Sequence, residues 1–478
     1  MNNIGRNKSF FLLAVSLLLF ASIYYLYKED IEKVTLILIG MFTLVVSPFL
    51  LNRISNLLLA IVFLTPLSID LTIGGGLKLS VPSEIIMLVI VGVVLLKYLG
   101  GMKVEKRILT HPMSVFVLLL IGSLIFSTVT SVDTSVSIKR TIAQSLFYVV
   151  FYFFFLAFLK KNEQLKKVYW LYGLGFIIPI IYTIIDHSKW GFIQPASVYA
   201  SLPFYDEHTI YGACLAFLVP FFMLNLVTKN QINSTFFLKL FVFSLLFVAL
   251  FLSYSRAAWI SVLAALLFYG FIKMKMKFYH FISIVLIIAG VLFFNFNSIY
   301  APLKENSLKY GDNFSTHIVS ITNLQNDASN MERINRWVCA VRMFEEKPVL
   351  GFGPGTYQFN YGKYQTNEFT TRISTHMGDK GNAHSEYLTY LSETGIVGFL
   401  VFLCLILYSI YLAIKLLYSD LDKSTKLLVY SSILGLITFY VHGLFNSFSD
   451  SQKMAILFIS SLAVLVRIDL NQASKQKT

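Results

Sequence analysis

The chain has 478 residues, of which 56% are hydrophobic, 16% aromatic and only 13% charged, with a mean hydropathy of +0.70. Soluble domains carry roughly a quarter charged residues, so this composition excludes that class and indicates an integral membrane protein. The formal net charge of +14 does not indicate a nucleic-acid partner, because more than half of the 39 lysines and arginines fall in the termini and in short loops on one predicted side of the membrane.

Apolar stretches of about 17–22 residues recur along the chain, and each is long enough to cross a bilayer core of roughly 30 Å as a helix. A membrane β-barrel would instead show short alternating segments. We therefore predict an all-α polytopic membrane protein with about 12–14 transmembrane helices. The predicted spans lie near residues 9–27, 34–51, 57–71, 82–99, 113–130, 142–159, 168–186, 209–228, 236–253, 256–272, 279–296, 393–414, 427–445 and 453–467.

The basic opening Met1–Lys8 leads into the first span without a cleavage pattern, which predicts a retained helix with its N-terminus inside the cell. The lysine-rich loops then also fall inside, as the positive-inside pattern requires. Four polar segments are predicted outside, near residues 187–208, 253–256, 297–384 and 442–452. The expected divisions are a helix bundle over 1–296, an extracytoplasmic loop over 297–384, further transmembrane helices over 385–467 and a cytoplasmic tail over 468–478.

The long loop contains a predicted amphipathic helix. Ser329-Asn330-Met331-Glu332 has the form of a capping box, and Lys347-Pro348 ends the helical pattern. Between them an apolar stripe recurs at helical spacing, made of Ile334, Trp337, Val338, Val341 and Phe344. We expect this helix to lie over the outer face of the bundle. Gly351-Phe352-Gly353-Pro354-Gly355 then predicts a tight turn.

Three arginines are candidates for binding an anion. Arg256 opens a predicted span, where a cation beside free helix N–H groups favours an anion, although an interfacial arginine reaching lipid headgroups is an equally good interpretation. Arg333 lies on the flank of the apolar stripe, and Arg336 lies farther round towards the polar face. Guanidinium groups suit paired phosphate oxygens, but a solvated helix face is the alternative.

His384 stands at the end of the long loop, just ahead of an apolar run. Imidazole gives or takes a proton near neutral pH, so a histidine fixed at a membrane surface is a candidate general base. The alternative is a capping or merely hydrogen-bonded interfacial histidine. If His384 is the base, we expect the rate to decline as pH falls through the histidine range.

Other polar residues have two interpretations each. Asp206-Glu207-His208 precedes a predicted span and either binds an acceptor or caps the helix. Glu386 and Glu393 are further candidates for acceptor binding or for structure, and the structural role is favoured for Glu393. The three cysteines lack metal-ligand spacing, and no nucleotide-binding or metal-binding motif is present, so we predict no disulfide, metal or cofactor.

Several of these motifs occur in a characteristic order. Arg333-x-x-x-Trp337, Pro348-Val349-Leu350-Gly351-Phe352-Gly353-Pro354-Gly355 and Ala383-His384-Ser385-Glu386-Tyr387-Leu388 with Glu393-x-Gly395-x-x-Gly398 resemble the signature of the O-antigen ligase/polymerase superfamily. The Ser255-Arg256-Ala257 corner resembles the upstream arginine motif of that superfamily. The resemblance covers roughly residues 200–450.

The resemblance implies a GT-C-like bundle in the bacterial inner membrane. It implies transfer of a glycan from undecaprenyl diphosphate, at the outer face, to a hydroxyl acceptor on a glycan, lipid or protein. Arg256 and Arg333, with Arg336 as a further candidate, would bind the diphosphate, and His384 would activate the acceptor hydroxyl. We expect metal-independent, inverting transfer, because arginines can stabilise the departing diphosphate and no paired carboxylates suggest a covalent intermediate.

Rival functions stay open at this point. A ligase, a polysaccharide polymerase and a protein O-oligosaccharyltransferase differ in acceptor rather than in core motif. A polytopic transporter or flippase is the non-enzymatic alternative. Transporters place ionisable groups near mid-span, whereas the candidate cations here stand at predicted helix ends.

Overall fold

The computed structural model describes residues 54–73, 77–227, 234–294, 328–367, 370, 374, 381–448 and 450–475. The chain divides into two compact units, Met1–Lys103 and Val104–Thr478. The predicted spans 9–27 and 34–51 lie outside the described residues.

The first unit contains a β-hairpin that the sequence analysis missed. Its elements are α3 (Ile54–Leu64), η1 (Thr65–Leu67), β1 (Ile69–Ile73), β2 (Leu77–Val81) and α4 (Ser83–Leu99). β1 pairs with β2 in antiparallel register, with Ile69 opposite Val81. The predicted span 57–71 is therefore wrong at its C-terminal end. Apolar and polar residues alternate on both sides of a Gly-Gly-Gly stretch, which is the pattern of a hairpin and not of a span.

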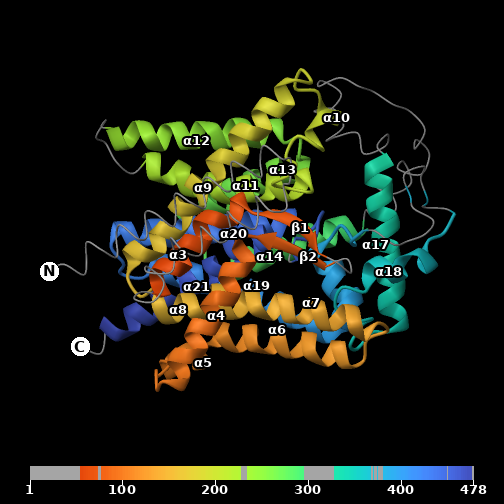
Figure 1. Cartoon of the computed structure of the whole chain (residues 1–478), viewed down its shortest axis with the longest axis horizontal. Coiled ribbons are helices and arrows are strands. Elements are labelled where there is room, and N and C mark those ends of the chain that lie inside the picture. The colour runs from red at the N-terminus through yellow and green to blue at the C-terminus, as the bar shows by residue number, and fades with distance from the viewer. Residues whose placement is uncertain are drawn as a thin grey trace, which may run out of the picture. The chain divides into compact units, whose positions relative to one another are not determined.

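The second unit is a helix bundle (Figure 1). Its elements are α5 (Lys106–Thr110), α6 (Pro112–Val129), α7 (Thr134–Tyr148), η2 (Val149–Phe154), α8 (Phe155–Phe158), α9 (Asn162–Ser188), α10 (Gln194–Ser197), α11 (His208–Val227), α12 (Ser234–Leu252), α13 (Arg256–Lys273), α14 (Phe278–Phe294), α17 (Ala328–Glu346), α18 (Tyr357–Asn360), η4 (Tyr361–Tyr364), α19 (Glu386–Tyr418), α20 (Lys423–His442) and α21 (Gln452–Lys475).

Within the described ranges, eight helices are long and apolar enough to cross a membrane. The prediction of a mostly helical, polytopic membrane protein is confirmed. Burial identifies the central helices: 89% of the α21 span and 78% of the α11 span are buried, against 33% of α13. α11, α20 and α21 thus form the core of the bundle, and the outer helices expose aliphatic side chains as lipid-facing helices do.

Short connections make successive helices antiparallel and define two ends of the bundle. The site end comprises the helix ends near residues 129–134, 188–208, 252–256 and 442–452 with the start of α19. At this end the Tyr254 hydroxyl donates to the Phe192 carbonyl (2.8 Å). The loop end comprises the helix ends near residues 104–111, 158–162, 273–278 and 418–423. There the Asn162 side chain donates to Thr425 Oγ1 (2.8 Å).

The predicted loop helix is present as α17, which packs on α19 at the site end with its axis across those of the bundle helices (Figure 1). The apolar stripe is not its most buried face, however. The buried residues are Met331, Glu332, Asn335, Arg336, Cys339, Ala340 and Met343, whereas Val341 of the stripe is 40% exposed. The cause is the segment that follows α17, because Phe352, Tyr357 and Tyr361 form one apolar cluster with Cys339, Ala340 and Met343. Small side chains let these rings approach, which a hydropathy pattern does not reveal.

Candidate functional site

The glycine-rich turn after α17 is fixed by a buried carboxylate. Gly351, Gly353 and Gly355 all have positive φ, between 70° and 111°, a conformation that other residues rarely adopt. Glu393 is 7% exposed and accepts hydrogen bonds from the backbone N–H groups of Gly355 (2.7 Å) and Tyr357 (3.1 Å). The position of Glu393 is therefore that of a structural residue, on the interior side of the turn.

α19 is interrupted at Gly395, where φ is 63° and ψ is −165°. The N–H of Ile396 donates to the Pro348 carbonyl (2.8 Å), and the N–H groups of Phe352 and Gly353 donate to the carbonyls of Ser392 and Glu393 (3.0 and 2.8 Å). The break therefore leaves the backbone groups on both sides paired, as apolar surroundings demand. It joins the glycine-rich turn to the first part of α19, which begins just after His384.

Arg336 is buried, which corrects the expectation that it lies towards the solvated face of its helix. It is 6% exposed, and its Nε donates to Glu332 Oε1 (2.9 Å). Its Nη1 donates to the Asn382 carbonyl (3.2 Å), and its guanidinium lies over the Tyr361 ring at 4.7 Å from the centroid. These contacts occupy the planar group and attach the segment before His384 to α17.

His384 is held in a left-handed backbone conformation, with φ of 47°. Such values are uncommon for residues other than glycine and cluster at functional sites. Its N–H donates to Asn382 Oδ1 (3.0 Å), and its carbonyl accepts from Trp337 Nε1 (3.2 Å). Trp337 of α17 and Asn382 thus fix the backbone of His384. The His384 imidazole interacts with the Asn446 side chain.

The electrostatic surroundings of His384 favour neutral imidazole. Burial is the largest cause, and the guanidinium groups of Arg336 and Arg333 add to it, against a smaller opposing effect of the Asn446 contact. Together they lower the pKa of His384 from its ordinary value of 6.5 to about 3. Neutral imidazole has a lone pair that can accept a proton, so the group is in the form that a general base requires.

Arg333 acts electrostatically on histidines from three parts of the bundle. Its guanidinium lies within electrostatic range of His208 at the start of α11, of His384 before α19 and of His442 at the end of α20. Arg333 and His384, which sequence analysis selected, therefore lie within electrostatic range of each other at the site end. A guanidinium among histidines is an arrangement that favours an anionic ligand.

The Ser253–Arg256 corner lies against the start of α11. α13 begins at Arg256, as predicted, and Tyr254 before it has a positive φ of 49°. A Cβ on Gly212 would lie 2.8 Å from the Ser255 Cβ, so only glycine there permits this approach. Because His208 precedes Gly212 by about one helical turn, the corner is close to the histidine that Arg333 acts on.

The predicted cluster at 206–208 divides into two parts. Asp206 and Glu207 are exposed, and the Glu207 carboxylate accepts from Thr209 Oγ1 (3.2 Å) in the first turn of α11. His208 is one of the histidines on which Arg333 acts electrostatically. The two carboxylates are thus placed as helix-start residues.

Glu386 is 1% exposed and organises the turn after α20. Its Oε2 accepts from the Phe448 N–H (2.7 Å), and its own N–H donates to the carbonyls of Gly443 (2.7 Å) and Asn446 (3.1 Å). This turn contains Asn446, whose side chain interacts with the His384 imidazole. Glu386 therefore positions a neighbour of the candidate base.

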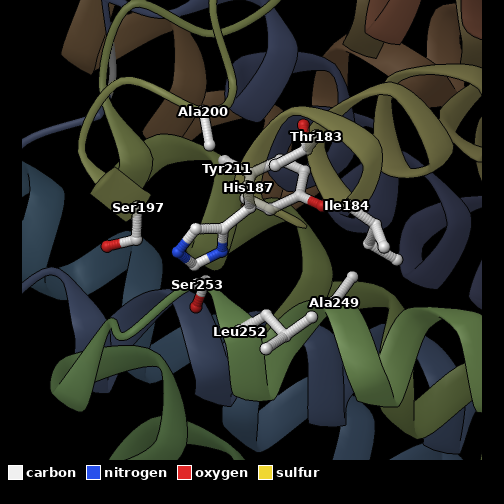
Figure 2. A pocket seen from close by; sticks show the side chains of 9 residues that line it. All are labelled: Thr183, Ile184, His187, Ser197, Ala200, Tyr211, Ala249, Leu252 and Ser253. Carbon is white, nitrogen blue, oxygen red and sulfur yellow. The ribbon is translucent and has the colours of Figure 1, made fainter. Parts of the chain in front are cut away.

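Two small cavities lie inside the bundle. Figure 2 shows the first, which is lined by Thr183, Ile184, His187, Ser197, Ala200, Tyr211, Ala249, Leu252 and Ser253. Its volume is about 10 Å³, which is room for about one water molecule. The second has the same volume and is lined by Gln144, Phe147, Tyr148, Tyr390, Phe439, Ala455, Phe458 and Ile459. Neither could hold a sugar, and neither is lined by His384 or by a candidate arginine.

Sequence reasoning missed His442, which the structure places beside Arg333. It begins the turn 442–452, one of the four polar segments that the sequence predicts outside. A comparison of all the histidines in those segments could have identified it. The described ranges contain no group of three or more histidines, cysteines and acidic residues arranged to hold a metal ion.

Comparison with known proteins gives one family match. Residues 241–403 match the model of the O-antigen ligase family, and this range includes Arg256, Arg333, Arg336 and His384. Members of the family are glycan-transferring enzymes that use lipid-linked glycans. No curated protein matches the chain. This multi-pass membrane protein therefore contains a domain of the O-antigen ligase family over residues 241–403.

Proposed function

We propose that this protein transfers a glycan from undecaprenyl diphosphate to a hydroxyl acceptor at the outer face of the bacterial inner membrane, as an O-antigen ligase-like enzyme. The observation that carries the proposal is that the Arg333 guanidinium lies within electrostatic range of His384, inside the range that matches the family. One group can neutralise a diphosphate and the other can take a proton, and glycosyl transfer to an alcohol needs both.

In the proposed reaction the acceptor oxygen forms a bond to the anomeric carbon of the donor sugar. The bond from that carbon to the diphosphate oxygen breaks, and the diphosphate leaves with the electron pair. The acceptor proton passes to the neutral ring nitrogen of His384. Attack opposite the leaving group gives inversion, because a single displacement has no covalent glycosyl intermediate.

Arg333 and Arg256 are assigned to the diphosphate. Arg256 at the first turn of α13 adds the helix N–H groups to the site, which favour an anion. Arg336 is assigned to positioning, because Glu332, Asn382 and Tyr361 already occupy its guanidinium. This arginine pair supplies the charge that a metal ion supplies in other transferases, so the proposal requires no cofactor.

The low pKa of His384 connects donor binding to chemistry. An isolated imidazole with a pKa near 3 is a weak base. A bound diphosphate would offset the two guanidinium groups, and the basicity of His384 would rise while the donor is present. His384 then becomes an effective base mainly in the complex.

The outer location follows from charge. The loop end carries the lysine clusters at 103–107, 160–167 and 273–277, and the positive-inside rule favours a cytoplasmic location for it. The site end is then extracytoplasmic. Cysteine labelling of residues in α17 tests this, since labelling exclusively from the cytoplasm would contradict the proposal.

Deletion of the gene tests the function in the cell. We expect an undecaprenyl-linked glycan to accumulate at the outer face and a surface glycan to be lost. Accumulation at the inner face would instead indicate a flippase. A purified-protein assay with the accumulated lipid and three acceptors, namely lipopolysaccharide core, glycan and protein, separates a ligase from a polymerase and a protein O-oligosaccharyltransferase.

A further inference from the structure

His442 has an unusual environment for a buried histidine. It is the last residue of α20 and is 1% exposed. Within the part of the chain that the structure describes, neither of its ring nitrogens has a hydrogen-bond partner. Its ring meets the edge of Phe448, 4.7 Å away between centroids. Buried polar atoms are nearly always paired, so two orphaned nitrogens on one side chain require an explanation.

Other buried histidines of the bundle show the usual solution. His187 is also 1% exposed, and its Nε2 pairs with the Ile193 carbonyl (2.8 Å). His111 is 6% exposed, with Nε2 near Asp469 (3.3 Å) and Nδ1 accepting from the Met113 N–H (3.2 Å). The fold can therefore satisfy a buried imidazole where nothing else has to be bound.

Among the described residues, Arg333 and His208 act electrostatically on His442. They come from α17 and α11, so three elements direct groups that can carry positive charge to one place. A negatively charged ligand among them would be attracted by the Arg333 guanidinium and could accept from an imidazole N–H. The unpaired nitrogens of His442 thus lie within electrostatic range of a group that favours an anion.

From this juxtaposition we propose that His442 is a ligand-contacting residue that donates a hydrogen bond to a phosphate oxygen bound beside Arg333. The inference rests on the proposed function, in which that phosphate belongs to the lipid diphosphate. Either tautomer of neutral imidazole has one N–H to donate, and a phosphate oxygen is a strong acceptor. The negative charge also offsets Arg333, so the second nitrogen can take up a proton and donate as well.

The test measures binding of undecaprenyl diphosphate to the purified, detergent-solubilised full chain, together with the melting temperature of the free protein. His442→Phe keeps the packing volume and removes both nitrogens. We expect its affinity for the lipid to fall on the order of 10- to 100-fold, since hydrogen bonds to charged groups are the strong ones. We expect its melting temperature without lipid to be no lower than that of the parent.

His442→Gln keeps an amide donor and should lose less affinity than His442→Phe. His187→Phe is the matched control, because it removes an equally buried histidine whose Nε2 pairs with the Ile193 carbonyl. It should lower the melting temperature and leave the affinity unchanged. If the Phe variant of His442 does not fold, ring-nitrogen NMR of the parent decides: the His442 signals, assigned with His442→Gln, should shift when the lipid is added.

The outcomes separate this inference from the proposed function. Parent-like affinity of His442→Phe, or His442 signals that do not move, would overturn the inference while the donor assignment stands. Equal binding of undecaprenol, which has no phosphate, would overturn both. If phosphatidylglycerol binds equally well and with the same dependence on His442, the phosphate contact stands and the site belongs to a lipid headgroup instead of the donor.

Discussion

His111 and His442 are buried histidines at opposite ends of the bundle, and their surroundings differ. At the loop end, His111 lies beside Asp469, which also accepts from Lys415 Nζ (3.0 Å). At the site end, the described groups that act on His384 and His442 include Arg333. At the loop end the fold therefore gives the buried His111 imidazole a carboxylate partner. At the site end the ring nitrogens of His442 have no hydrogen-bond partner among the described residues, as expected where a ligand completes the site.

The largest effect should come from His384, the proposed general base. Residues at the loop end should have no effect on the chemical step. His384→Ala should still bind donor, while turnover falls by roughly 10²–10⁴-fold through loss of proton transfer. His384→Gln keeps hydrogen bonding without basicity. The control is His111→Ala, which should affect stability and leave single-turnover transfer unchanged. Parent-like transfer by the Gln protein would make His384 structural.

The next effect concerns the arginines. Arg333→Lys and Arg256→Lys keep charge but lose the planar donor pair, so kcat/KM should fall about 10- to 100-fold. Arg107→Lys is the matched change at the loop end, in an exposed pair with Glu105 (2.9 Å), and should have no measurable effect. If all three variants behaved alike, the two ends would not differ as we describe.

A smaller effect should follow from moving the base without removing it. A Cβ on Gly381 would overlap Nη1 of Arg336, which the Asn382 carbonyl and Glu332 hold in place. Gly381→Ala should shift the segment before His384 and lower kcat by about tenfold, because small misplacements of a catalytic group are costly. In α6, a Cβ on Gly122 would meet nothing within 4 Å, so Gly122→Ala is the control. Equal activity of both variants would argue against this attachment.

The pH profile should differ from the one that the sequence suggests. Neutral His384 is the active form, and its pKa is lowered to about 3, so protonation in the free enzyme occurs well below the ordinary histidine range. The profile of kcat/KM, which reports the free enzyme, should therefore stay flat on its acidic side down to about pH 5. A half-loss of kcat/KM near pH 6.5 would show that His384 is not in this environment.

The smallest effect is expected from chelation. Full activity should remain in EDTA, because the proposed charge stabilisation comes from Arg256 and Arg333. Loss of transfer that Mg²⁺ or Mn²⁺ restores would place a divalent ion in the mechanism.

The sequence predicted most of the helices, because long apolar runs and their flanking charges report membrane crossing directly. It also predicted α17 and the glycine-rich turn. It missed the hairpin, where a period of two in hydropathy was read as part of a span. It also placed Arg336 towards the polar face of α17, because the residues that bury that face, Tyr357 and Tyr361, approach it only through tertiary packing.

For the candidate site, the sequence identified individual residues but not which residues surround them in the fold. Motif order selected Arg333 and His384, and the structure places them together. No local sequence signal identifies His442, because its distinguishing feature is that its ring nitrogens have no hydrogen-bond partner among the described residues. Orphaned atoms are a property of the folded chain, and no spacing in the sequence encodes them.

The break at Gly395 has a consequence for mutational tolerance. The connection between the glycine-rich turn and α19 is made by main-chain atoms, and main-chain hydrogen bonds persist under most side-chain changes. Val349, which is 59% exposed beside this connection, should accept many substitutions. Gly351 and Gly395 should accept almost none, because a Cβ on either would collide with the opposite backbone. Sequence change in this segment should therefore be tolerated at exposed side chains such as Val349 and not at these glycines or at Glu393, whose carboxylate also holds the turn.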